Sequence, residues 1–264
     1  MSDEKTNKFP LIDSPEIPDS VDNAVKNLTD TLTKNAGQTF GDIWYLVFGG
    51  ISHAADKKKM KYAHDLETYS QELNVAIEQI PTGEKVEPSI QVAAQALENS
   101  KYCISEPELR KMFVNLISNS MNSRTFREVH PSFPEIIKQM SPLDAEILSE
   151  FKKYSAQPIA KFLLVYPGGT SKVLEDYLYF CPEGSHSYYY ASSISSLERL
   201  GLLFVDFNSC LSDDSQYNNF YDWAYLKHLK KEYENTATNQ TVRVRKGVCK
   251  LTPLGRHFVD VCLP

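Results

Sequence analysis

The segment VHPSFPEIIKQMSPLDAEIL, residues 129–148, holds two helix starts that lie only nine residues apart. Ser132 can cap a helix whose third residue, Glu135, reaches back to it, and Ser141 repeats this pattern with Asp144. Pro142 suits the first position of the second helix and pushes the residue before it out of the helical region, which enforces a break. Two adjacent capped starts predict a rigid corner, which we interpret as the joint between a helical N-terminal half and a differently built C-terminal half.

Apolar residues recur every three or four positions along most of the N-terminal half, as they do in amphipathic helices. The pattern predicts helices that begin near residue 21, run over 56–80 and follow Pro88, and a further helix capped by Ser105 with Glu108. The first twenty residues are polar and rich in proline, which is typical of a flexible arm. We therefore predict a mainly α protein, with a flexible arm at 1–20 and an all-helical domain at 21–140.

The C-terminal half follows a different order of elements. A short helical pattern ends at Gly201, a segment of strand composition follows, and after a polar stretch TVRVRKGVCKL alternates like a half-exposed strand. Thr252 can then cap a closing helix. This order is that of a winged helix-turn-helix, so we predict a winged-helix-like α+β domain at 141–264 with an insertion at 208–241.

Two further helices are predicted inside this C-terminal domain. One is a short helix over SKVLEDYLYF, residues 171–180. The other is the centre of the insertion, NNFYDWAYLKHLKKEYE, which places Phe220, Trp223, Leu226 and Leu229 on one side.

The most apolar stretch is FGDIWYLVFGGISHAA, residues 40–55. It is shorter than the roughly 17–25 apolar residues that a membrane-spanning helix needs. One interpretation is a core helix buried by its neighbours. The other is a segment that inserts into a membrane after a trigger, helped by the basic run DKKKMK behind it. The candidate membrane or partner contacts are Trp44, Tyr45, Val47 and Phe48.

The composition is ordinary for a globular protein, with a net charge of −6. Residues 1–140 carry 15 Lys and Arg against 20 Asp and Glu, whereas residues 141–264 carry 13 against 14. The acidity therefore lies in the first half. The five cysteines are scattered without zinc-site spacing and predict buried free thiols. The first twenty residues contain no apolar core of a signal peptide, so we predict a cytoplasmic protein.

Several phrases of the sequence resemble the abortive infection alpha family of bacterial proteins. They are the Val86-Glu87-Pro88 entry, ELRKMFVNLISNSMN, HPSFPEIIKQMSP, and LERLGLL paired with LTPLGRHF. The resemblance covers most of the chain from about residue 40, and the corner is its most specific part. It implies a role in defence against bacteriophage, in which an infected cell stops growing or dies before progeny are released. It implies no catalytic residues, and the insertion at 208–241 is longer than a minimal wing requires.

None of the common hydrolase, phosphate-binding, dinucleotide-binding or zinc-protease motifs occurs in the sequence. We therefore predict no catalytic residues, no metal and no cofactor, and leave an uncharacterised hydrolase as an alternative. The preferred hypothesis is a protein that acts by binding nucleic acid or a protein partner through its C-terminal domain, with self-association left open. Six basic residues are the candidate phosphate contacts: Lys227, Lys230, Lys231, Arg243, Arg245 and Lys246.

Overall fold

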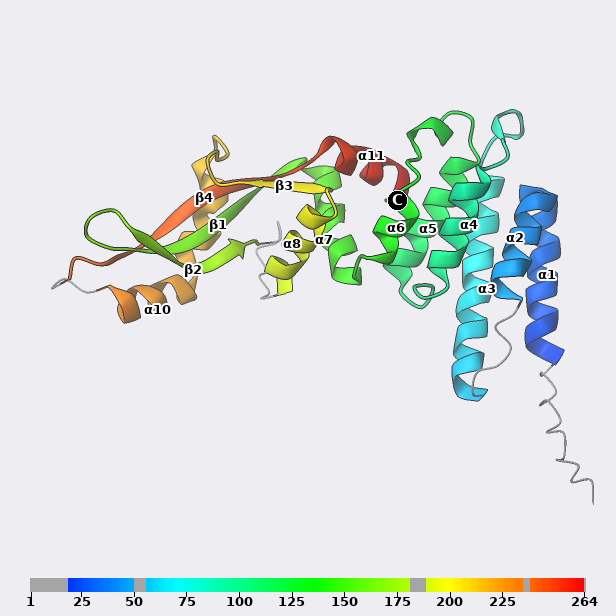
Figure 1. The fold of residues 1–264 in the computed structure, drawn as a ribbon, viewed down its shortest axis with the longest axis horizontal. Coiled ribbons are helices and arrows are strands. Elements are labelled where there is room, and N and C mark those ends of the chain that lie inside the picture. Colours follow the sequence, from blue (N-terminus) through cyan, green and yellow to red (C-terminus); the bar gives the residue numbers. More distant parts are fainter. Residues whose placement is uncertain (1–18, 50–55, 181–188, 235–237, 264) are drawn as a thin grey trace, which may run out of the picture.

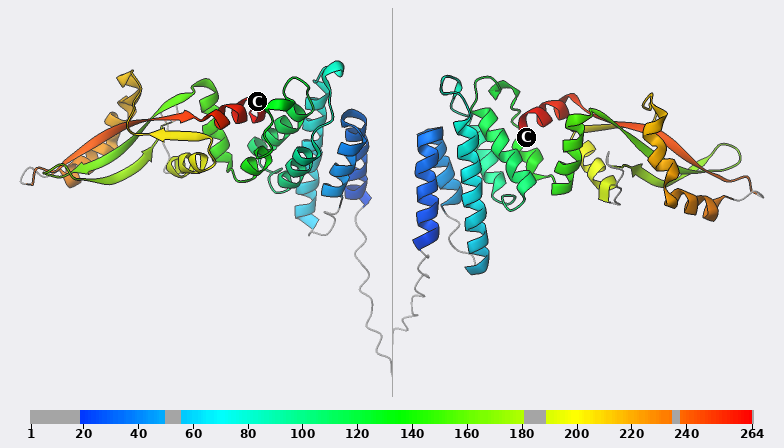
Figure 2. Two further views of the ribbon diagram at one scale, coloured as in Figure 1. Left: turned by 45° about the horizontal axis from the view of Figure 1, so that its top comes forward. Right: turned by 180° about the vertical axis from the view of Figure 1, so that it is seen from behind.

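The computed structural model describes residues 19–49, 56–180, 189–234 and 238–263, with side chains from residue 28 and, after the first gap, from residue 61. It is an elongated molecule with a helical body at one end and an antiparallel sheet extending from it (Figure 1). The two further views show the same separation of the helices and the far end of the sheet (Figure 2). The predicted arm at 1–20 lies almost wholly outside the described residues.

The N-terminal half is helical, as predicted. Its elements are α1 (Asp19–Ala36), α2 (Gln38–Phe48), α3 (Asp56–Glu78), α4 (Ile90–Ser100), α5 (Pro107–Ser120) and α6 (Phe133–Lys138), with short 3₁₀ turns η1 (Thr82–Glu84) and η2 (Phe126–Glu128). The third helix matches the apolar stripe that predicted a helix over 56–80.

The C-terminal half combines helices with a sheet. Its elements are α7 (Pro142–Lys153), β1 (Ala156–Val165), β2 (Ser171–Leu178), α8 (Tyr189–Arg199), β3 (Leu203–Asp206), η3 (Asp214–Tyr217), α9 (Asn218–Asp222), α10 (Ala224–Tyr233), β4 (Thr241–Leu251) and α11 (Pro253–Cys262). The strands pair antiparallel in the order β2-β1-β4-β3. The protein is thus mainly helical with a four-stranded sheet in its C-terminal part.

The predicted sequence of helix, glycine stop, two strands and closing helix is present as α8, Gly201, β3, β4 and α11. Gly201 has φ 75°, a conformation that glycine adopts without strain. Thr252 caps α11 by accepting a hydrogen bond from the Gly255 N–H at 2.8 Å. Two further strands, β1 and β2, complete the sheet, so the winged-helix identity itself stays a prediction.

The helix predicted over residues 171–180 is wrong, because residues 171–178 form strand β2. Gly168 and Gly169, with φ of 93° and 88°, turn the chain so that β2 runs back along β1. The register shifts twice along this pair, and Tyr177, with φ 52°, lies at one of the shifts. These irregularities break the two-residue alternation of a strand, so the apolar residues of this segment imitate a helical spacing.

One of the two predicted caps forms at the corner. Ser141 accepts from the Asp144 N–H at 3.1 Å, and the Asp144 carboxylate accepts from the Ser141 N–H at 2.8 Å. The predicted cap at Ser132 is wrong. The Ser132 hydroxyl lies 2.7 Å from His130 Nδ1, and Glu135 is drawn away because it accepts from Asn99 at 3.1 Å.

The predicted cap at Ser105 is also wrong. Helix α5 begins at Pro107, so its N-cap position is Glu106, and Ser105 lies one residue too early to cap it. Pro107 at the first helical position supplies the start signal instead, since its fixed φ suits a helix and its missing N–H needs no partner there.

The main core is continuous across the corner. It joins Trp44, Phe113 and Phe133 of the N-terminal helices to Ile194 of α8 and Phe258 of α11, all at most 1 % exposed. Phe133 and Phe258 meet edge to face with ring centroids 5.1 Å apart. Packing therefore holds α6 and α11 together on either side of the predicted domain boundary at residue 140.

A second core lies between the sheet and the insertion. Helix α10 and the elements before it cover one face of the sheet, where Phe162, Phe180, Phe220, Leu226 and Leu229 are buried together. The predicted helix in the insertion is confirmed in α9 and α10. Its apolar side is buried at Phe220, Leu226 and Leu229, and Trp223 packs against the same cluster.

Candidate nucleic-acid interface and a pocket beside the sheet

Three of the six predicted basic residues lie on one helix. Leu226 and Leu229 hold α10 against the sheet, and Lys227, Lys230 and Lys231 are exposed on its outer side. Their spacing of three and four residues places them on neighbouring positions of one helix surface. They form no ion pair with any other residue that the structure describes, so their charges are available to a ligand.

The two arginines lie on the opposite face of the sheet. Side chains alternate along a strand, and Val242 and Val244 of β4 pack toward the insertion, so Arg243 and Arg245 point away from it. Arg245 donates to the Phe207 carbonyl and to Asn208 Oδ1, each at 3.2 Å. The arginines and the α10 lysines therefore form two separate groups.

Lys246 belongs to neither group. It points to the insertion side, where its Nζ lies 2.9 Å from Asp214 Oδ2 and above the rings of Tyr217 and Tyr221. The hydrogen bond to Asp214 raises the pKa of Lys246 above its ordinary value. Because its charge is already matched, Lys246 is the weakest of the six candidates for a phosphate contact.

Lys161 joins the arginine face although the sequence did not single it out. It stands opposite Arg245 in the β1–β4 register, and opposed residues of antiparallel strands share a face. Its Nζ lies 4.1 Å from the centroid of the Phe207 ring and 2.9 Å from Asp176 Oδ1. The only sequence signal was a lone lysine inside the apolar run PIAKFLLV.

The segment that carries these residues is basic in an acidic chain. Residues 218–250 contain seven Lys and Arg against three Asp and Glu, a net charge of +4, whereas the whole chain has −6. This positive segment contains α10 and β4, which lie in the part of the molecule that extends from the helical body (Figure 1).

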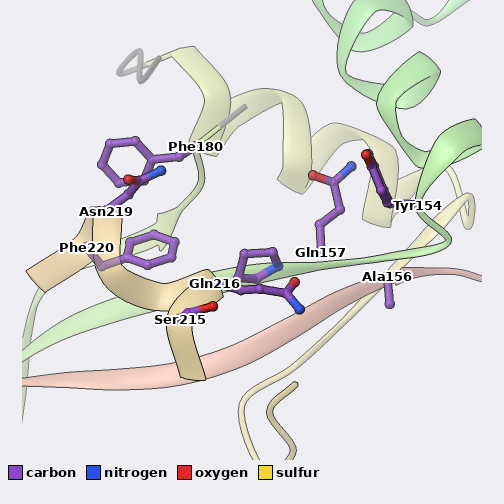
Figure 3. Close-up of a pocket in the computed structure, with 9 residues that line it drawn as sticks. Tyr154, Ala156, Gln157, Phe180, Ser215, Gln216, Asn219 and Phe220 are labelled. Carbon is purple, nitrogen blue, oxygen red and sulfur yellow. The ribbon is translucent and has the colours of Figure 1, made fainter. Parts of the chain in front are cut away.

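A pocket of about 250 Å³ lies where the insertion meets the start of β1. Figure 3 shows Phe180, Asn219 and Phe220 on one side of it, Tyr154 on the other, and Gln157 between them. No Lys, Arg, Asp or Glu is among the described residues that line it. Its polar groups are the neutral amides of Gln157, Gln216 and Asn219 and the hydroxyls of Ser215 and Tyr154.

Gln157 is the unusual member of this pocket. It is 3 % exposed, and its Oε1 accepts a hydrogen bond from the Tyr179 hydroxyl at 2.7 Å. Its Nε2 has no hydrogen-bond partner within the described part of the chain. A buried donor left without a partner costs about 1–3 kcal/mol, and this nitrogen is enclosed by the protein with almost no accessible surface. Sequence reasoning missed it, and only the pair Gln157-Pro158 inside an apolar strand hinted at it.

The described part of the apolar stretch at 40–55 forms helix α2 and packs in the core, as the first interpretation predicted. Trp44, Val47 and Phe48 of α2 are buried in the main core, and Tyr45 is exposed. Residues 50–55 and the side chains of Lys57, Lys58 and Lys59 lie outside the described residues. Among the helices that are described, none has both the length and the apolar character to cross a membrane.

The cysteines match their prediction in part. Cys103, Cys249 and Cys262 are buried free thiols, and burial raises the pKa of Cys249 and of Cys262. Cys210 is an exposed free thiol, which corrects the prediction for that residue, because it lies in the polar loop before η3. Cys181 falls outside the described residues. The residues with described positions contain no group of three or more His, Cys, Asp or Glu placed to hold a metal ion.

Comparison with known proteins places the chain in a family. No curated protein and no solved structure matches it. The family model described as abortive infection alpha matches residues 61–262, a range that includes the corner, the sheet and the insertion. The chain therefore belongs to the abortive infection alpha family, the family that its sequence resembles.

Proposed function

We propose that this protein takes part in abortive infection by binding nucleic acid through its C-terminal sheet and insertion, and that it acts by binding rather than by catalysis. Membership of the abortive infection alpha family supports the role in phage defence. The observation that carries the binding proposal is the row of Lys227, Lys230 and Lys231 on the outer side of α10. These lysines are exposed and unpaired among described residues, within a segment of net charge +4.

Phosphate groups are the ligands that such a row fits best. Each lysine that contacts a phosphate releases condensed counterions, so affinity falls steeply as salt rises. Helix α10 presents its lysines from a surface that Leu226 and Leu229 anchor to the sheet, which holds their spacing. A predicted winged-helix order in α8, β3, β4 and α11 is compatible with this role, although such modules also bind proteins.

Fluorescence anisotropy of the full chain with labelled duplex and single-stranded oligonucleotides, repeated at several salt concentrations, tests the proposal. We expect binding whose logarithm falls linearly with the logarithm of salt. The variant Lys227→Glu, Lys230→Glu, Lys231→Glu should reduce that slope by about 2–3, because each duplex phosphate contact contributes about 0.9.

A matched variant separates the α10 surface from net charge. Lys34→Glu, Lys61→Glu, Lys111→Glu changes the charge by the same amount at exposed positions of the helical body, and should leave the slope nearly unchanged. Equal effects of the two triple variants would show general electrostatic attraction and contradict a site on α10. Absence of binding at low salt would contradict the nucleic-acid proposal and favour a protein partner for the C-terminal part.

The arginine face is tested separately with Arg243→Glu and Arg245→Glu. If nucleic acid contacts α10 alone, these changes leave the salt slope near its original value. If the ligand wraps the far end of the sheet, both the α10 and the arginine variants weaken binding. In cells, the α10 triple variant should lose protection against a phage that the unmodified chain restricts, while the helical-body variant keeps it.

The membrane alternative is not favoured, because Trp44, Val47 and Phe48, on which it depended, are engaged in the main core. The hydrolase alternative stays a prediction without a residue to carry it.

A further inference from the structure

We infer that the outer half of the arginine face binds an acidic amphipathic helix of a protein partner. This outer half consists of Leu163 and Val165 of β1, Val173 of β2, and Arg243 and Arg245 of β4. The register places Leu163 opposite Val173 on one side and opposite Arg243 on the other, and opposed residues of antiparallel strands share a face. The inference goes beyond the proposed function, because the α10 lysines lie on the other side of the sheet.

Strand β1 carries apolar residues on both faces of the sheet. Its run PIAKFLLV is almost continuously apolar, a pattern typical of strands that are buried on both sides. Phe162 and Leu164 are buried beneath the insertion, whereas Leu163 and Val165 on the other face are half-buried and Val173 beside them is 47 % exposed. These last three residues pack into neither core. They form an aliphatic row that no described element covers.

The inner half of the same face shows what covers a sheet in this protein. Ile159 and Cys249 are fully buried there, in one core with Ile194 of α8. Tyr177 of β2 donates to Glu198 of α8 at 2.8 Å, which fixes the helix to the sheet. Helix α8 lies beside the inner part of the sheet, and β1, β2 and β4 continue beyond it (Figure 1). A helix therefore covers the inner half, and no described helix covers the outer half.

The charge of the outer half specifies an acidic partner. Arg243 and Arg245 are exposed, and neither forms an ion pair with any residue in the described part of the chain. Arg245 donates to two neutral oxygens, which leave its positive charge unmatched. Guanidinium groups pair most strongly with carboxylates. Two of them beside an aliphatic row match a helix that has carboxylates flanking an apolar stripe.

Nucleic acid fits this outer half less well than a protein does. Sheets that bind unpaired bases stack them on aromatic rings, whereas Leu163, Val165 and Val173 are aliphatic. A phosphodiester backbone would lie on these side chains and would meet only the two arginines, although its affinity depends on the number of cations that it contacts. An apolar helix stripe instead gains from removing the same aliphatic surface from water.

The experiment measures anisotropy of a labelled synthetic peptide of about 18 residues, long enough to form a helix, with the full chain. The peptide has Leu at helical positions i, i+3, i+4 and i+7, Glu on both flanks and Gln elsewhere. We expect saturable binding at low salt. The same peptide with Lys in place of Glu should bind at least about tenfold more weakly, because like charges then face each other. A shuffled peptide, whose leucines do not share one face, should also bind more weakly.

One variant tests the aliphatic row. Leu163→Thr with Val173→Thr keeps side chains that favour a strand and removes apolar surface, so we expect about a tenfold higher Kd for the acidic peptide. Val75→Thr is the matched control, because Val75 is an apolar residue of α3 that is 55 % exposed. It should leave the Kd unchanged.

A second variant tests the charges through a gain of binding that an unfolded chain would not show. Arg243→Glu with Arg245→Glu should weaken binding of the acidic peptide and strengthen binding of its Lys counterpart. Lys34→Glu with Lys111→Glu makes the same change of charge at exposed positions of the helical body and should preserve the preference for the acidic peptide. The α10 triple lysine variant should bind the acidic peptide normally, so failure of this inference and failure of the proposed function give different results.

Several results would overturn the inference. They include no binding of the acidic peptide, equal binding of the acidic and Lys peptides, and equal effects of a face variant and its control. Self-association in sedimentation that is lost in the Leu163 and Val173 variant would assign the outer half to a second copy of the chain. Flotation with phosphatidylglycerol vesicles that the same variant abolishes would assign it to a membrane. An oligonucleotide salt slope that depends on Arg243 and Arg245, without peptide binding, would assign it to nucleic acid.

Discussion

The main core and the second core of this chain differ in the segments that contribute to them and in the side chains that they bury. The main core draws buried residues from every helix between α1 and α8 and from α11, so it depends on segments from both ends of the sequence. The second core is small and aromatic, and it joins one face of the sheet to the insertion through pairs such as Phe180–Phe220 and Phe180–Trp223. The comparison indicates that the protein's frame and its proposed binding surface can be perturbed separately.

The largest expected effect comes from Phe258→Ala in the main core. Phe258 is fully buried and packs on Phe133 across the corner, so its loss should cost about 3–5 kcal/mol of unfolding free energy. Denaturant unfolding should show a single transition whose midpoint lies at a lower denaturant concentration than that of the unmodified chain. His257→Ala, an exposed neighbour on the same helix, should change stability by under about 0.5 kcal/mol. A transition that splits in two would mean that the corner separates independently folding units.

Leu226→Ala tests the second core. Leu226 is 1 % exposed beneath α10, and the change should cost about 2–4 kcal/mol of local stability. Amide hydrogen exchange should quicken in α9, α10 and the far half of β4, with protection of α5 kept. Faster exchange throughout the helical body would contradict the separation of the two cores. His228→Ala on the exposed side of α10 is the control.

The contact between β2 and α8 is expected to respond to alkaline pH. Tyr177 donates to Glu198 at 2.8 Å, and this hydrogen bond, followed by burial, raises the pKa of Tyr177 from 10.0 to about 12. A raised pKa means that the folded state retains a proton that the unfolded state releases, so this contribution to stability is complete below pH 10 and is lost as pH rises through 12.

Tyr177→Phe should therefore lower the unfolding free energy at pH 9 by about 1–2 kcal/mol, and the difference from the unmodified chain should shrink toward pH 12. Tyr102→Phe, at a residue that is 74 % exposed, should show no such convergence. A difference that stays constant with pH would remove the Tyr177–Glu198 bond as its cause.

The smallest expected effect compares the two helix starts at the corner. Ser141→Ala breaks a formed capping box and should cost about 1 kcal/mol, whereas Ser132→Ala removes no cap and should cost less than about 0.5 kcal/mol. Thermal unfolding of both variants measures the difference. Equal losses would show that the His130–Ser132 contact contributes as much as the cap.

Local signals predicted much of this fold because they act over a few residues. Each signal that was predicted correctly involves residues close together in the sequence. They are the apolar stripe of α3, the capping box of Ser141 and Asp144, the Thr252 cap and the amphipathic helix of the insertion. The cap at Ser105 was misplaced locally, because Pro107 starts α5, but two other errors arose where a distant partner decided the outcome. Residues 171–178 form a strand because they pair, irregularly, with β1. Glu135 does not complete a capping box with Ser132 because its carboxylate accepts a hydrogen bond from Asn99, which is 36 residues earlier in the chain.

The sequence by itself determined the helical N-terminal half, the break before Pro142, the family, and which residues carry positive charge near the C-terminus. Only the tertiary structure decided where those charges point: the lysines outward on α10, the arginines on the opposite face, and Lys246 onto Asp214. It also created the pocket at Gln157, whose walls come from β1 and from residues almost sixty positions later in the insertion. The physical reason is that helix caps and periodicity are local, whereas the face of a strand and the walls of a pocket depend on pairing and packing between segments far apart in the chain.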